Sequence, residues 1–95
     1  MITGKTSSGF EFTVSENLKN DFRFVLAYDE LMNGTPAAQL GASPKLVKLV
    51  LGEDGAKALY AHVQEPDGFL PTDKVMAELT EIVTASGKAN GEVKN

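Results

Sequence analysis

The side chains that could carry chemistry are few and widely spaced. His62 is the only histidine, and Glu65, three residues further on, is the nearest carboxylate that could assist it in general acid–base catalysis. Ser7 and Ser8 have no histidine close in sequence that could activate a nucleophile. There are no cysteines, which excludes disulfides, thiolate metal sites and cysteine nucleophiles. We therefore expect His62 to be an ordinary surface residue near a helix end, and the protein not to be an enzyme.

Neither metal binding nor phosphate binding is indicated. Glu65, Asp67 and Asp73 surround a Pro-Asp-Gly turn, but an EF-hand loop places its ligands at alternate positions and ends on a glutamate. Gly52 and Gly55 lack the Lys-Ser or Lys-Thr pair that a P-loop needs. These residues fit turns and helix caps instead, so we expect no metal and no cofactor.

The charge balance disfavours nucleic acid and membranes as partners. The 95 residues carry nine Lys and Arg against thirteen Asp and Glu, a net charge of −4, which repels phosphate backbones and anionic lipid surfaces. Residues 1–5 contain no long apolar run, so we expect no secretory signal. The apolar-rich segment 46–51 is too short to span a bilayer. The pattern predicts a small soluble domain in the cytoplasm.

The elements that must position these groups begin with a hairpin. Phe10, Phe12 and Val14 alternate with polar residues, which predicts a half-buried strand with these side chains on one face. Gly9, in the preceding turn, can take a positive φ, so residues 2–5 can pair back as the first strand. Because an isolated hairpin is marginal in water, its aromatic face must pack on helices or on another chain.

An α+β, mostly helical fold is predicted, with this N-terminal β-hairpin packed on four main helices plus one short helical turn. Capping residues, apolar spacing and glycine stops delimit the helices. Their expected bounds are 22–33, 44–51, 53–63 and 73–86 for the main helices and 36–41 for the short turn.

The last third of the chain gives three further expectations. Phe69 and Leu70 are predicted to anchor their loop in the core. Glu78 and Glu81 fall on the solvent side of the last helix. Residues 1–86 form a single globular domain, and the polar stretch 87–95 is predicted to be a disordered C-terminal tail.

A domain this small has difficulty burying all of its large apolar side chains. Its aromatic residues, apart from Tyr60, are Phe10, Phe12, Phe22, Phe24, Tyr28 and Phe69. Either all six share one core, or some remain outside it and mark a surface for protein binding or self-association. On the second hypothesis, the hairpin and the first helix supply the partner-binding residues, namely Phe10, Phe12, Phe24, Tyr28 and Leu31.

The order of the segments resembles a known family. Thr-Gly-Lys-Thr-Ser-Ser-Gly-Phe-Glu-Phe at 3–12 is followed by a helix, then by Leu-Val-Lys-Leu-Val-Leu-Gly-Glu at 46–53 and Leu-Tyr-Ala-His-Val at 59–63. Asp-Gly-Phe-Leu-Pro at 67–71 then precedes a closing amphipathic helix. Across residues 3–85, this order is similar to that of the short tail assembly chaperones of siphophages and prophages of Gram-positive bacteria.

The resemblance implies a non-enzymatic role in phage tail assembly. Such chaperones coat the long, helical, apolar tape measure protein before tail tube subunits polymerise around it, and they leave before the virion matures. The implied partners are the tape measure protein, the tail tube protein and further copies of the same chain, in the cytoplasm of the bacterial host.

A second hypothesis comes from a different class of protein. Two short helices joined at Gly52, within residues 46–63, would suit a small helix-turn-helix-like DNA-binding regulator. Glu53 and Asp54 then stand at the helix end that should meet DNA, and their charge opposes contact with phosphates.

Overall fold

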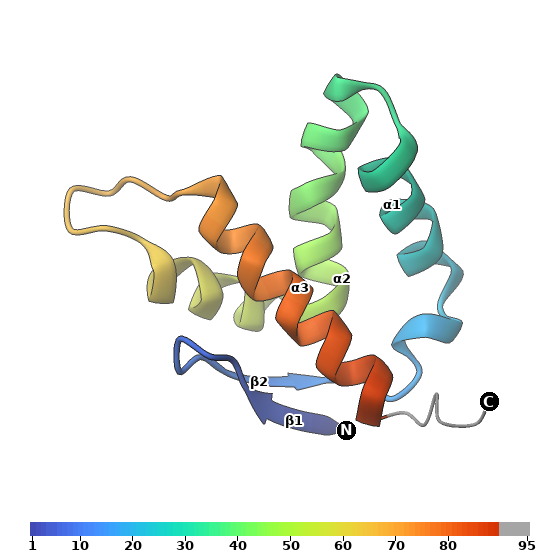
Figure 1. Cartoon of the computed structure of the whole chain (residues 1–95), viewed down its shortest axis with the longest axis horizontal. Helices are drawn as coiled ribbons and strands as arrows, with labels where there is room; N and C mark the ends of the chain where they lie inside the picture. The colour runs from blue at the N-terminus through green and yellow to red at the C-terminus, as the bar shows by residue number, and fades with distance from the viewer. Residues whose placement is uncertain (90–95) are drawn as a thin grey trace.

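The computed structural model describes residues 1–89, with the side-chain surroundings of residues 1–86. A short antiparallel hairpin is followed by one turn of 3₁₀-helix and three α-helices (Figure 1). In chain order the elements are β1 (Ile2–Lys5), β2 (Glu11–Val14), η1 (Leu18–Asn20), α1 (Phe22–Asn33), α2 (Pro36–Val63) and α3 (Thr72–Ala89). The predicted mostly helical α+β class is confirmed, although the number of main helices is three and not four.

The hairpin forms as its alternating pattern predicts. Strands β1 and β2 pair antiparallel with Gly4 opposite Phe12, and Gly9 in the turn has a φ of 93°. Phe10, which directly precedes β2, and Phe12 and Val14 within it are all buried. The ring of Phe12 lies over Gly4, where an added Cβ would come within 2.7 Å of the ring. A glycine at this position therefore lets the aromatic ring lie close against the opposite strand.

Helix α1 begins and ends where its capping residues predict. The Asp21 carboxylate accepts a hydrogen bond from the Arg23 backbone N–H at 3.0 Å, which satisfies one of the free donors of the first turn. Gly34 follows the last turn, and its N–H donates to the Glu30 carbonyl. Phe24 and Ala27 are the buried residues of this helix.

The helix prediction was wrong in one respect in the middle of the chain: the expected elements 36–41 and 44–51 form one continuous helical segment, whereas the expected break at Gly52 is present as a bend within α2. α2 begins after Thr35, whose hydroxyl accepts from the Ala38 N–H at 3.2 Å, and it continues through Pro44. Pro44 removes only its own hydrogen bond, to the carbonyl of Leu40, and that residue is exposed to water. Gly52 interrupts the helix with a φ of 77°, a conformation that glycine adopts without steric cost.

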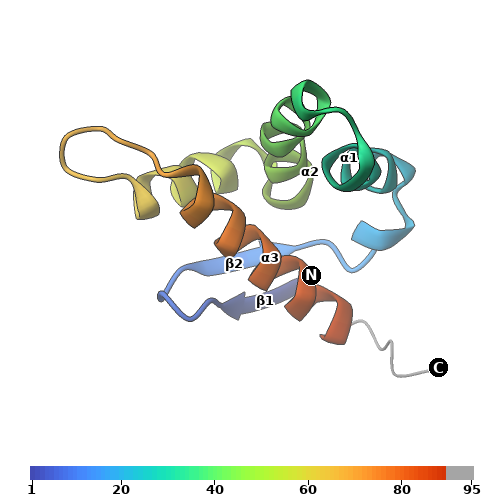
Figure 2. The same cartoon turned by 45° about the horizontal axis from the view of Figure 1, so that its top comes forward.

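The bend at Gly52 divides α2 between two parts of the fold. Its first half lies beside α1, and the two run together away from the hairpin (Figure 1). Its second half and α3 lie against the hairpin, with α3 crossing the strands in both views (Figures 1 and 2). The molecule therefore has two arms, which meet over the hairpin. We call α1 with the first half of α2 the upper arm, and the second half of α2 with α3 the lower arm.

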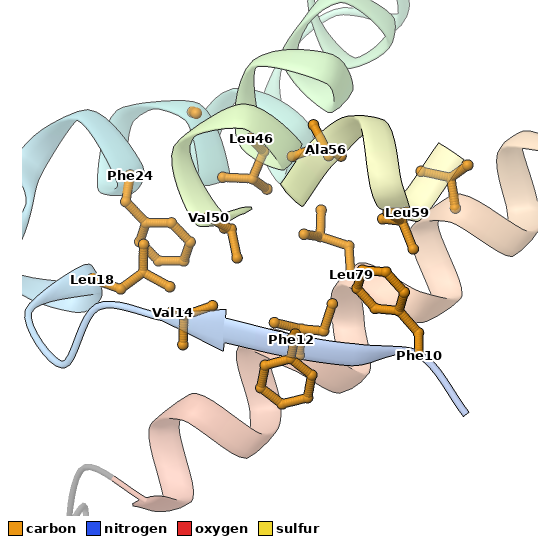
Figure 3. Close-up of a cluster of buried hydrophobic side chains, with 14 residues drawn as sticks. Phe10, Phe12, Val14, Leu18, Phe24, Leu46, Val50, Ala56, Leu59 and Leu79 are labelled. Carbon is orange, nitrogen blue, oxygen red and sulfur yellow. The ribbon is translucent and has the colours of Figure 1, made fainter. Parts of the chain in front are cut away.

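The core lies where the two arms and the hairpin meet. Side chains from β2, η1, α1, both halves of α2 and α3 converge there (Figure 3). Leu59 and Ile82 are completely inaccessible to solvent. This core contains Phe10, Phe12 and Phe24, so the aromatic face of the hairpin packs on helices of its own chain.

Helix α3 extends beyond the stop that the sequence predicts for it. The sequence predicts a stop at residues 86–87, whereas α3 runs on to Ala89. The remaining part of the predicted tail, residues 90–95, lies outside the described residues. Of the helices within residues 1–89, none combines the length and apolarity needed to cross a membrane.

The core predicts a sharp contrast between two leucine substitutions. Leu59→Ala removes a fully buried side chain and is expected to lower the free energy of unfolding by about 3 kcal/mol. Leu40→Ala, in the same helix but with a side chain 71% exposed, should change it by less than about 0.5 kcal/mol. Urea denaturation followed by circular dichroism measures both values, and equal losses would contradict this description of the core.

Candidate functional site

The hairpin turn brings together polar residues that are far apart in the sequence. The Ser8 hydroxyl lies 2.9 Å from Nε2 of His62 and donates to the Glu78 carboxylate at 2.6 Å. The His62 ring also lies beside Phe10, with ring centroids 5.4 Å apart. The sequence offered no signal for this cluster. Its members come from the turn between β1 and β2, from α2 and from α3, and they are separated by up to 70 residues.

The direction of these hydrogen bonds argues for a structural role. A serine hydroxyl has one hydrogen, and in Ser8 it points to Glu78. The Ser8 oxygen therefore accepts from His62 Nε2–H, so this histidine is not placed to withdraw the serine proton as a general base would. The cluster ties the hairpin turn to both helices of the lower arm.

A second carboxylate holds the same turn. Glu81 accepts from the Ser7 backbone N–H at 2.8 Å and from the Ser7 hydroxyl at 2.6 Å. These two hydrogen bonds lower the pKa of Glu81 below its ordinary value of 4.5. The expectation of a solvent-facing side chain was therefore wrong for Glu78, which is buried, whereas Glu81 is partly exposed and both carboxylates bind the hairpin turn.

The acidic residues around the 65–68 turn do not form a metal site. Within residues 1–89, no cluster of three or more His, Asp or Glu side chains could hold a metal ion. Glu65, Asp67 and Asp73 do not converge; Asp67 instead accepts from the Phe69 N–H at 3.0 Å, and Asp73 accepts from the Lys74 N–H at 3.0 Å. These are turn and helix-start contacts.

The most distinctive surface feature is an apolar groove between the two arms. Two hollows, of about 260 and 110 Å³, lie along α3 and share Met76 as a lining residue. We call them together the α3 groove. Its apolar lining residues are Tyr28, Leu31 and Met32 from α1, Leu40, Pro44, Leu46, Val47 and Tyr60 from α2, Leu70, and Val75, Met76, Leu79 and Val83 from α3.

Several rim residues of the α3 groove remain strongly exposed. Leu40 is 71% exposed, Met32 53% and Tyr28 43%, although each carries a large apolar side chain. Thr80 and Thr84 on the α3 side are the polar residues of the narrower hollow. Since the pocket lining contains no charged side chain, the groove suits an apolar occupant.

The five predicted partner-binding residues separate into two groups. Phe10, Phe12 and Phe24 are each no more than 7% exposed, so their predicted availability to a partner was wrong. The reason is that the hairpin uses its aromatic face to close the core and that Phe24 points from α1 into the same core. Tyr28 and Leu31 do line the α3 groove.

Other exposed apolar residues were missed or misplaced by sequence reasoning. Met76 and Leu40 had no assigned role, although Met76 lies at heptad spacing from Val83 on α3. Phe69 was expected to anchor its loop in the core, but it is 60% exposed and only Leu70 packs against the core. The turn at 65–68 closes through backbone hydrogen bonds and so does not need the Phe69 ring.

Comparison with known proteins adds no further guide to this site. The chain matches no protein-family model, no curated protein and no solved structure. The function must therefore be argued from the geometry, together with the segment order described above.

The turn contacts predict how stability depends on pH. Because folding lowers the pKa of Glu81, its ionised form stabilises the fold fully above pH 4.5, and this contribution is lost as the pH falls through the lower folded value. Glu81→Gln should therefore be less stable than the native chain near pH 7 and nearly equal to it near pH 3. Urea unfolding at several pH values tests this.

Glu65→Gln is the matched control, because that carboxylate is exposed in the 65–68 turn. It should follow the native curve at both pH values. If the difference in unfolding free energy between Glu81→Gln and the native chain were the same at pH 7 and at pH 3, the carboxylate charge would not hold the turn.

Proposed function

We propose that this protein is a non-enzymatic tail assembly chaperone that binds apolar helical segments of a tape measure protein in the α3 groove. The observation that carries the proposal is the open, uncharged groove with the large apolar side chains of Tyr28, Met32 and Leu40 on its rim. Exposed apolar surface of this kind is typical of a protein-binding site.

The lining of the α3 groove suits a helix as its occupant. Amphipathic helices bind in apolar grooves through side chains at i, i+3, i+4 and i+7, and a methionine on each wall allows the groove to adapt to different residues. Met32 belongs to the upper arm and Met76 to α3. A groove of this kind favours repetitive apolar helices over one particular sequence, as a coating protein for a long tape measure helix requires.

The proposal extends to the other expected partners and to location. Several copies bound along one long client would combine weak individual contacts into high avidity while each copy remains displaceable. We include self-association of the chain and recruitment of the tail tube protein in the same role. The setting proposed is the cytoplasm of a bacterial host, with the chaperone absent from the mature virion.

The DNA-binding alternative receives no comparable support from the described residues. Residues 46–63 form two helical segments that meet at the bend at Gly52, and the second segment buries Ala56 and Leu59 in the core. Glu53 and Asp54 are exposed at the start of its second half, where a recognition helix would meet DNA phosphates.

Co-expression tests the proposed function directly. The client to express with and without the native chain is a long, helix-rich tape measure protein, which the proposal expects to be encoded next to this gene. We expect the client to be insoluble alone and soluble with the chain. If it is equally soluble alone, the chaperone function is refuted.

A groove variant tests the binding site itself. Tyr28→Lys combined with Met32→Lys places two charges on the groove rim and should weaken client binding by about tenfold or more, because two desolvated apolar contacts are lost. Phe69→Lys is the matched control, since Phe69 is equally apolar and exposed but lies outside the groove. Equal loss of soluble client with both variants would contradict the assignment of the groove.

A further inference from the structure

A third hollow lies on the opposite flank of α1 from the α3 groove, between α1 and the first half of α2. Its volume is about 620 Å³. We call this surface the α1–α2 face; it is lined by Arg23, Leu26, Ala27, Asp29, Glu30, Lys45, Lys48 and Leu49. Leu26 is 57% exposed, and Phe22, one helical turn before it, is 67% exposed. Unlike the α3 groove, this face therefore combines an apolar centre with charged residues.

The charges on the α1–α2 face are separated by sign along its length. α1 and α2 run antiparallel and are joined at residues 34–35. Glu30 lies about one turn from this connection, whereas Lys45 and Lys48 lie roughly 2.8 and 3.6 turns beyond it. At about 1.5 Å per residue, the two signs are offset by roughly 9–13 Å along the helix axes.

These charges are not neutralised within the chain. Of the ion pairs among the described side chains, none includes Glu30, Lys45 or Lys48. Arg23 is already engaged by Asp21. The face thus has an acidic end near the α1–α2 connection and a basic end formed by two lysines of α2, with Leu26 between them and Leu49 next to Lys48.

We propose that the α1–α2 face is the site at which two copies of this chain form a two-fold symmetric dimer. In a two-fold interface the same surface patch of both copies is buried. If one element of the first copy contacts a different element of the second, the same contact therefore forms with the two copies exchanged. An antiparallel arrangement places Asp29 and Glu30 of each copy opposite Lys45 and Lys48 of the other. The apolar centres then meet at the two-fold axis.

A second copy fits this face better than an apolar client helix does. An apolar helix would cover the hollow but leave the charges of both ends without partners, and charged groups removed from water without a partner are destabilising. A second copy supplies the opposite charge at both ends at once. Dimerisation at this face deepens the self-association included in the proposed function and rests on it. It also leaves the α3 groove of each copy open, because the two surfaces lie on different flanks of α1.

Two charge-reversal variants provide the test. One variant, Asp29→Lys with Glu30→Lys, makes both ends of the face basic; the other, Lys45→Glu with Lys48→Glu, makes both ends acidic. All four side chains are exposed, so the fold should persist, and circular dichroism verifies this. Sedimentation equilibrium at low salt measures the mass of the full chain and of each variant over a range of concentrations.

The expected pattern is specific to an interface of this symmetry. The native chain should approach twice its mass of 10.1 kDa as its concentration rises, while each variant alone stays monomeric through like-charge repulsion. An equimolar mixture of the two variants should recover the dimer, since basic ends then meet acidic ends at both contacts, and added salt should weaken it. Lys57→Glu, an exposed reversal outside the face, should dimerise like the native chain.

Three results would overturn the dimer proposal. They are a native chain that stays monomeric at all concentrations, variants that dimerise as well as the native chain, and a mixture that remains monomeric. Solubility of the co-expressed client is measured in parallel. A native chain that stays monomeric yet protects the client would refute dimerisation at this face without touching the chaperone function, whereas a native dimer that protects no client would do the reverse.

Discussion

The fold depends on covering the apolar face of a two-stranded hairpin that could not persist alone. Phe10, Phe12 and Val14 require a surface to pack against, and the second half of α2 together with α3 supplies it (Figure 3). The turn of the hairpin is held to the same helices by Glu78 and Glu81. Burial of the apolar face and hydrogen bonding of the turn thus hold the hairpin against the same two helical segments, and together they fix where α3 runs.

The position of α3 decides what remains outside the core. The bend at Gly52 directs the first half of α2 away from the hairpin, and α1 follows it. Only one stripe of α1, centred on Phe24 and Ala27, can reach the core from this upper arm. The apolar residues on the other sides of α1 are consequently left at the surface, on two flanks that face different hollows. We infer that one flank serves the client and the other a second copy.

The local elements could be predicted from sequence because their signals are local. The alternation at 10–14, the Asp21 cap and the break at Gly52 each follow from the preferences of a few neighbouring residues. Pro44 misled the prediction, because a proline can start a helix or be tolerated inside one, and only the surroundings decide between these.

The site was less predictable because it depends on contacts between distant segments. A one-sided stripe does not reveal whether it faces the core or a groove, so Phe24 was assigned to the surface and Glu78 to solvent. The Ser8 cluster joins residues 54 and 70 positions apart, and no spacing rule covers such distances. What composition did indicate was an excess of apolar surface, and Phe22, Tyr28 and Phe69 remain exposed as that excess.

Nuclear magnetic resonance of the three methionine methyl groups would test most directly whether the α3 groove receives a client helix. Met32 and Met76 lie on opposite walls of the groove, and Met1 is exposed at the distant hairpin. Titration of the methyl-labelled chain with an apolar helical fragment of the client should shift the Met32 and Met76 signals and leave Met1 unchanged. Binding of the fragment with both groove signals unmoved would contradict a role for this groove.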